Sequence, residues 1–226
     1  MRNNRRTRLL HGAVGAVTAV LAVTGWWLLS GREGHHSLLA RLAGETDATL
    51  HRKAGWVLVA LVVAAVSVGV RGAITFVRET VRVDRGDGGW FVRWPAAALR
   101  RGRGFPRHRG HFDPGQRVAN VAFVVVLGTL IGTGVALTTL HGGPAFVWLV
   151  RVHRYATYAF VALVAGHVLV ASGVLPGYRG VWRAMHLGGR VPAATARRLW
   201  PADEGRRAAL HRSTTTPPAV GRGPRR

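Results

Sequence analysis

The sequence predicts an all-α membrane protein, a four-transmembrane-helix up-down bundle with both termini in the cytoplasm. Two observations predict it: four long stretches lack Asp, Glu, Lys and Arg, and most basic residues fall in segments that would share one side of a membrane. The uncharged stretches cover residues 9–31, 54–70, 118–150 and 155–178. Each is near or above the roughly 17 to 25 residues that cross a bilayer as a helix.

The first predicted span, residues 9–31, follows four arginines, as the apolar core of a signal peptide would. It is too long for such a core, and Trp26 and Trp27 stand where a small-residue cleavage site would be. Tryptophan at this end is typical of an interfacial anchor. We therefore expect a retained helix.

The second span is expected over residues 52–72 and the third over residues 118–138. The third uncharged stretch is longer than one span, and its helix should end before the run His141-Gly-Gly-Pro144, because Gly and Pro stop helices. Residues 145–152 would then form an outer interfacial turn. The fourth span follows over residues 153–175.

The sequence also predicts the structure of two segments outside the spans. The longest connection, residues 71–117, is punctuated by Gly and Pro, so we expect a partly structured surface loop. The basic tail, residues 201–226, contains Pro and repeated Arg and is predicted to be disordered. The transmembrane domain would thus occupy residues 1–200.

The net charge of +23 invites a nucleic-acid function, since clustered Arg neutralises phosphates. The distribution of the charge argues against it. With both termini inside, 26 of the 32 basic residues lie on the inner side and 6 on the outer side. This is the bias that orients membrane proteins, so no nucleic-acid partner is expected.

The chain has no cysteine, which excludes an iron–sulfur cluster, a disulfide and a haem attached through a Cys-x-x-Cys-His site. A redox centre would have to rest on His or Met. Met1 and Met185 are the two methionines, and both lie outside the spans.

Four of the eleven histidines lie inside the predicted spans or at their edges, where an ionisable side chain usually has a specific partner. They are His11, His51, His153 and His167. A lone histidine in such a place is more often a packed or interfacial residue than a metal ligand. The other seven fall in loops and need no special explanation: His35, His36, His108, His111, His141, His186 and His211.

The predicted topology sorts these four histidines into two pairs at two depths. His51 and His153 lie toward the outer side, and His11 and His167 toward the inner side. His153 and His167 are fourteen residues apart, about 21 Å along a helix and roughly 40° short of four turns, so both face one side. Imidazole suits iron, and two axial ligands leave electron transfer as the function of a haem. Four small residues near them would let a flat ring approach, although ordinary small-residue packing between helices explains each one singly at least as well: Gly12, Gly15, Gly55 and Gly166.

Around these histidines the sequence resembles the gamma subunit, a membrane cytochrome b, of respiratory formate dehydrogenases and related hydrogenase cytochrome b subunits. The likeness covers about residues 5–200 and is carried by short motifs together with the His153 to His167 spacing. These motifs are Leu50-His51 with Gly55, Gly115-Gln116-Arg117, Gly132-Thr133-Gly134, and Gly180, Trp182, Met185 and Gly189-Arg190-Val191.

The resemblance implies a di-haem b-type cytochrome subunit that transfers electrons between a partner dehydrogenase and the quinone pool. His11 and His167 would bind the inner haem iron, and His51 and His153 the outer. Menaquinone or ubiquinone would bind near the inner haem, at Asp113, Gly115 and Gln116. The family implies a bacterial cytoplasmic (inner) membrane, contact with lipid, and peripheral dehydrogenase and iron–sulfur subunits that act on the donor substrate.

Two positions depart from the family pattern. Asp113 stands where the family typically has Asn, and Arg197-Arg198-Leu199 replaces a His-rich stretch, which leaves the partner dehydrogenase open. Asp113 also has a purely structural interpretation, as the cap of the third span. A different function remains as the alternative, a haem-free transporter or anchor that uses buried histidines for protons or metal. The long uncharged stretches that make up most of the expected spans argue against it.

Overall fold

The computed structural model describes residues 5–31, 35–100 and 105–199. All regular structure in these residues is helical, which confirms the predicted all-α fold. Four helices are long and apolar enough to cross a membrane: α1 (Arg5–Leu29), α3 (Asp47–Val68), α6 (Pro114–Thr139) and α7 (Gly143–Ala171). The predicted disordered tail, residues 201–226, lies outside the described residues.

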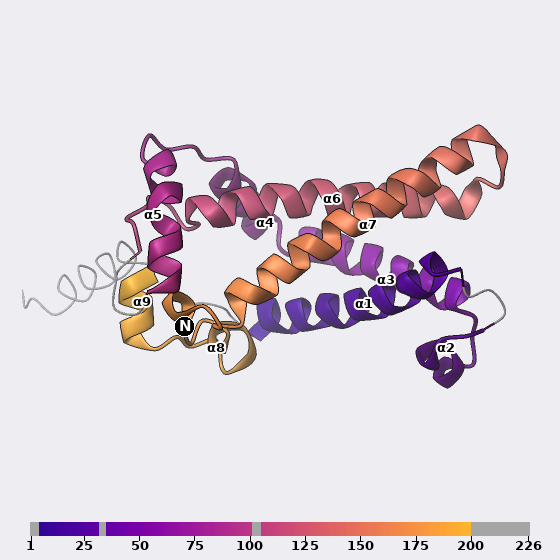
Figure 1. Ribbon diagram of the computed structural model, residues 1–226, viewed down its shortest axis with the longest axis horizontal. Helices are drawn as coiled ribbons and strands as arrows, with labels where there is room; N and C mark the ends of the chain where they lie inside the picture. The colour runs from indigo at the N-terminus through magenta and orange to yellow at the C-terminus, as the bar shows by residue number, and fades with distance from the viewer. Residues whose placement is uncertain (1–4, 32–34, 101–104, 200–226) are drawn as a thin grey trace, which may run out of the picture.

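The four long helices run up and down in chain order (Figure 1), with α1 packed along α3 and α6 along α7. α1 starts at the end of the molecule where α5 (Asp87–Leu99), α8 (Arg183–His186) and α9 (Ala193–Leu199) lie. α2 (Leu38–Ala43) and the α6–α7 turn lie at the opposite end. Following the predicted topology, we call the α5, α8 and α9 side the inner end and the α2 side the outer end.

The turn between α6 and α7 corrects the expected start of the fourth helix. α7 begins at Gly143, so residues 145–152 are helical, and the prediction of an interfacial turn there was wrong. Gly142 and Gly143 reverse the chain with φ of 79° and 78°, a region that favours glycine. Pro144 then occupies the first turn of α7, where its missing N–H costs nothing, so this proline starts a helix.

The long inner connection is more ordered than the sequence suggested. It contains α4 (Val70–Thr80) and α5, with Pro95 inside α5, so the segment predicted as a partly structured surface loop holds two helices. α4 is separated from α3 at Gly69, where a Cβ would lie 2.7 Å from the carbonyl oxygen of Ala65. α5 packs against the short 3-10 helix η1 (Pro176–Tyr178), and the Trp94 indole donates a hydrogen bond of 2.7 Å to the Tyr178 hydroxyl.

A buried arginine ties the inner connection to the start of α6. Arg117 is 3% exposed, and its guanidinium donates to the backbone carbonyls of Arg82 and Phe112 at 3.1 Å each and to that of Arg109. It also forms ion pairs with Asp84 at 3.2 Å and Asp87 at 3.0 Å. These bonds satisfy a buried charge that would otherwise be costly.

Asp84 shows the electrostatic effect of that network. Burial alone would raise the pKa of its carboxyl, but hydrogen bonds and charge from Arg82 and Arg117 outweigh burial and lower it. The carboxylate form of Asp84 is therefore favoured in the folded protein.

The outer end is closed by a second polar network. Ser37 caps α2, and its backbone N–H and hydroxyl both donate to the Asp47 carboxylate, at 2.8 and 2.5 Å. Asp47 lies in the first turn of α3, where a negative charge suits the helix dipole. Thr46 caps the same helix. His51, four residues further along α3, is therefore on a helix whose start is fixed.

Candidate functional site

The structure brings the rings of His51 and His153 together between the two helix pairs. His51 projects from the second turn of α3 and His153 from α7, and their ring centroids lie 6.3 Å apart at an interplanar angle of 81°. Both rings line a mostly apolar cavity of about 510 Å³ between α1, α3, α6 and α7. Cofactor pockets usually fall between roughly 300 and 1,000 Å³.

His11 and His167 form a second pair nearer the inner end. Their ring centroids are 6.1 Å apart at an interplanar angle of 44°. Phe123 of α6 packs edge-on against His167 at 5.9 Å. The imidazole of His186, a residue expected to be an ordinary loop histidine, lies 6.1 Å from that of His11.

The spacing within each pair suits one metal centre held between two imidazoles. Taking the zinc–imidazole bond of roughly 2.0–2.1 Å as a guide, and about 1.1 Å from each nitrogen to its ring centre, two rings bound on opposite sides of one metal ion would have centroids roughly 6.3 Å apart. The observed separations of 6.3 and 6.1 Å match this value. In the described part of the chain no group of three or more His, Asp or Glu residues could hold a bare metal ion. A pair of imidazoles could instead hold an iron whose other ligands a porphyrin supplies.

The glycines near these histidines also fit a flat cofactor. A Cβ added at Gly12, Gly15, Gly55 or Gly166 would meet nothing within 4 Å. Packing between helices of this chain therefore does not explain why these four positions are glycine. Of the four, Gly55 lines the cavity beside His51, where a macrocycle would need open space beside the backbone.

Two arginines that sequence reasoning missed lie at the same cavity. Arg52 and Arg154 directly follow His51 and His153, and both line the cavity. Because α7 starts ten residues before the predicted span, Arg154 lies well inside a long apolar helix instead of at its start. An arginine in such a place usually has an anionic partner or extends to the interface. The carboxylates of a haem would supply that partner.

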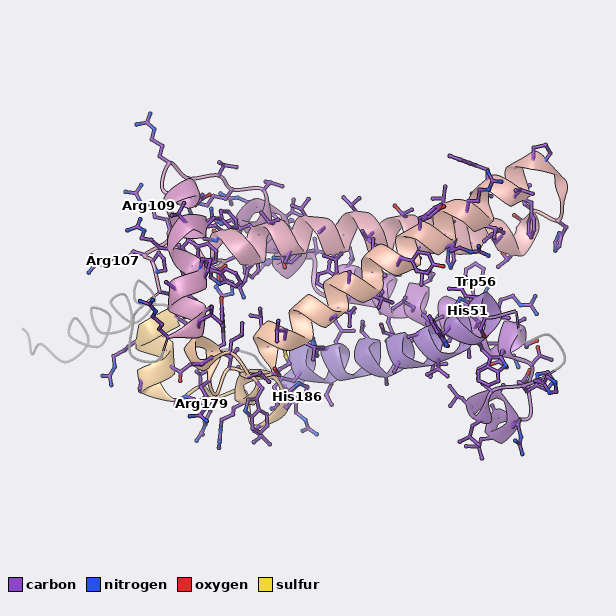
Figure 2. All side chains as sticks on the ribbon, in the orientation of Figure 1. His51, Trp56, Arg107, Arg109, Arg179 and His186 are labelled. Atoms are coloured by element: carbon purple, nitrogen blue, oxygen red, sulfur yellow. The ribbon has the colours of Figure 1, made fainter. Side chains whose placement is uncertain are left out.

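Two threonines were also missed, since nothing in a single helix marks them. Thr24 of α1 lies 2.9 Å from Nδ1 of His51, and Thr133 of α6 lies 2.8 Å from Nδ1 of His153. Figure 2 places His51 and Trp56 toward the outer end, and Arg107, Arg109, Arg179 and His186 at the inner end.

The residues expected to meet quinone stand at the start of α6. Asp113 caps this helix as predicted: its carboxylate accepts from the Gln116 backbone N–H at 2.8 Å, and the Gln116 side chain accepts from the Asp113 backbone N–H. Gly115 packs against α5, because a Cβ there would lie 2.9 Å from Cη2 of Trp90. Trp90 is 2% exposed, and its indole N–H has no hydrogen-bond partner among the described residues.

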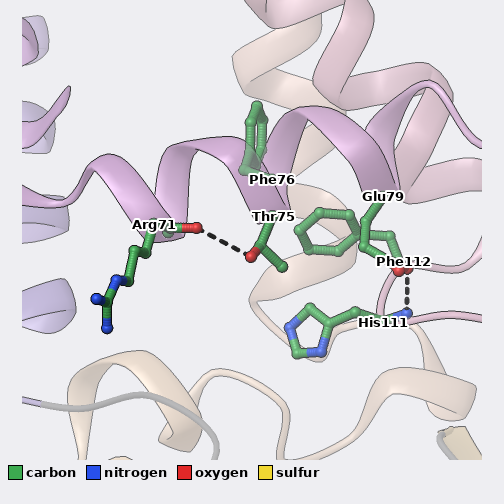
Figure 3. A pocket seen from close by; sticks show the side chains of 7 residues that line it. Arg71, Thr75, Phe76, Glu79, His111 and Phe112 are labelled. Atoms are coloured by element: carbon green, nitrogen blue, oxygen red, sulfur yellow. Dashed lines mark hydrogen bonds between the residues drawn. The ribbon is translucent and has the colours of Figure 1, made fainter.

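A second, more open pocket of about 380 Å³ adjoins this stretch (Figure 3). Phe76 of α4 and Phe112 form its apolar wall, with ring centroids 5.8 Å apart. The polar rim includes Glu79, which accepts a hydrogen bond of 2.6 Å from the backbone N–H of His111. The pocket thus combines aromatic surface with polar groups, directly before the Asp113 cap.

A comparison with protein families identifies the family of this chain. The family model for prokaryotic cytochrome b561 matches residues 2–188, which include all four long helices and both histidine pairs. No curated protein sequence matches the chain. Proteins of this family are bacterial multi-pass membrane proteins that bind haem b and transfer electrons. The chain belongs to the prokaryotic cytochrome b561 family.

Proposed function

We propose that this protein is a di-haem b-type cytochrome subunit that transfers electrons between a partner dehydrogenase and the quinone pool of the bacterial inner membrane. The pairs His51/His153 and His11/His167 would each hold one haem iron. Bound haem would supply reversible one-electron chemistry. The likeness to formate dehydrogenase gamma subunits supports a donor complex with dehydrogenase and iron–sulfur subunits, docked at the outer end.

The observation that carries the proposal is the placement of two facing histidine pairs at two depths of one bundle. α7 contributes a histidine to each pair, and fourteen residues of helix separate these two by about 21 Å. Two imidazoles per site would hold the iron, and a haem held by two protein ligands favours electron transfer over oxygen chemistry. The two sites together span most of a bilayer core of roughly 30 Å.

The side chains around each site would bind the haem and balance its charge. Arg52 and Arg154 stand where they would neutralise the carboxylates of a haem between His51 and His153, and the cavity wall is mostly apolar, as a porphyrin ring requires. At the other site, Phe123 restricts the orientation of the His167 ring by edge-on contact. Rigid helices hold both pairs, so electron transfer would need little movement of the protein.

We place the quinone at the inner end, between α4 and the start of α6. The pocket beside Phe76 and Phe112 offers an aromatic wall for a quinone ring, and Asp113 lies one residue beyond it. Phe123, which touches His167, is nine residues after Pro114, so the start of α6 lies on the order of 13 Å along the axis from that histidine. A carboxylate at Asp113 is suited to pass protons from the cytoplasm to a reduced quinone.

The first test is optical and functional. Purified protein, expressed with haem supply, should give a dithionite-reduced minus oxidised spectrum typical of b-type haem, and a soluble quinone analogue should reoxidise it. A protein that binds no haem under these conditions would favour the haem-free transporter or anchor. A haem protein that the quinone analogue does not reoxidise would retain the cytochrome assignment and exclude the quinone link.

A further inference from the structure

We propose that Thr24 and Thr133 are positioning residues for the axial histidines of the outer haem, and that their hydrogen bonds lower its reduction potential. The inference rests on the proposed function, because it assumes that His51 and His153 bind a haem iron. In this proposal the two threonine hydroxyls determine which imidazole nitrogen of each histidine faces the metal.

The hydrogen bonds fix the direction of donation. The Thr24 hydroxyl is 2.8 Å from the Val20 carbonyl oxygen, and the Thr133 hydroxyl is 2.6 Å from the Thr129 carbonyl oxygen. Each hydroxyl has one proton, and at these distances it is donated to the carbonyl of its own helix. The threonine oxygen that faces each histidine is therefore an acceptor.

It follows that Nδ1 of His51 and of His153 must carry the proton. Their donation to Thr24 at 2.9 Å and to Thr133 at 2.8 Å leaves Nε2 of each ring unprotonated, with a lone pair for iron. Both threonines are buried, at 0% and 8% exposure, so water competes little for these bonds.

The two threonines occupy matching positions in different helices. Each is followed by a glycine, and each glycine faces the Cε1 atom of the same histidine. A Cβ added at Gly25 would lie 3.2 Å from Cε1 of His51, and one added at Gly134 would lie 3.5 Å from Cε1 of His153. A Thr-Gly pair on α1 and another on α6 thus receive the two imidazoles from opposite sides of the site.

A hydrogen bond from Nδ1 makes an axial imidazole a stronger electron donor to its metal. A stronger donor favours ferric over ferrous iron, so the reduction potential falls. Two such bonds act on the outer site. The other site differs: neither ring nitrogen of His11 or His167 has a hydrogen-bond partner in the described residues, and these rings contact each other, Phe123 and His186. The inner haem is therefore an internal reference.

The test replaces each threonine with valine, which keeps the shape and removes the acceptor. Redox titration of purified Thr24→Val, Thr133→Val and the double variant should show the outer potential rising in each single variant and rising further in the double. We expect a change in the reduction equilibrium of up to about tenfold, or about 59 mV for a one-electron couple. The inner potential should stay at its wild-type value, and a His51→Ala protein that lacks the outer haem identifies it.

Serine at either position restores the acceptor and should restore the wild-type potential. If the valine variants lose the outer haem while the serine variants keep it, that result supports the positioning role as well. A double valine variant that keeps both haems at wild-type potentials would overturn the inference, as would equal shifts of both haems. A wild-type protein with fewer than two haems would refute the proposed function instead, so the two failures are distinguishable.

Discussion

Replacing Arg117 with alanine should destabilise the folded protein by about 3 kcal/mol. The side chain is 3% exposed and donates to three backbone carbonyls and two carboxylates that join α4, α5 and the start of α6. Removing one partner of a buried, hydrogen-bonded ion pair typically costs roughly 3–5 kcal/mol. We take the lower end because Asp87 is still 20% exposed and water can reach it once the arginine is gone.

The assay is thermal unfolding in detergent micelles, followed by far-ultraviolet circular dichroism. For a chain of this length the loss corresponds to a fall in the melting temperature of roughly 6 to 12 °C. Arg78→Ala is the matched control, because Arg78 lies exposed on α4 and its substitution removes the same charge. Its effect should stay within about 0.5 kcal/mol. If both variants melt within about 2 °C of each other, Arg117 does not hold the inner connection together in the way described.

Three further predictions concern pH, quinone and packing. The folded-state pKa of Asp84 lies below its ordinary value, so the carboxylate stabilises the fold above about pH 4, and this stabilisation is lost as pH falls through the folded-state pKa. Asp84→Asn should therefore flatten the acid side of a plot of melting temperature against pH, and identical plots for the variant and wild type would contradict this. Asp113→Asn should keep both haems and the helix cap but slow quinone reduction with a changed pH dependence, whereas unaltered kinetics would leave Asp113 as a cap alone. Gly25→Ala should displace His51 and disturb the outer haem spectrum, while Gly134→Ala, whose added methyl makes an ordinary contact, should resemble wild type; equal spectra would refute the difference.

Much of the fold follows from the sequence because lipid imposes strong rules on a chain. Long apolar stretches must become helices, and the distribution of arginine predicts their order across the membrane. From that order alone the four histidines sort into two pairs, and the structure places the same rings within 6.3 Å of each other. Which side of the membrane each end faces stays a prediction.

The helix boundaries were harder to predict, because local signals have two meanings. Pro144 can end one helix or begin the next, and here it begins α7. Pro95 falls in the segment predicted to be a partly structured loop, yet it lies within α5, whose apolar residues pack against η1. Tertiary packing decides both cases, and a single sequence does not display it.

The partners of the site residues could not be predicted from the sequence, for a related reason. Thr24 and Thr133 are ordinary helical threonines until another helix brings a histidine to them. His186 looked like a loop residue, and only the return of the chain after α7 places it beside His11. Asp113 was the exception, since a cap followed by Pro, Gly and Gln is a local pattern that the sequence shows directly.

The central claim is that four histidines form two independent haem sites, and haem per chain in histidine variants tests it most directly. Wild type should hold about two non-covalent haems. A double variant within one pair, His51→Ala with His153→Ala, should keep one, whereas a double variant across the pairs, His51→Ala with His11→Ala, should keep none. If both double variants, folded as judged by circular dichroism, hold the same number of haems, the pairing is wrong.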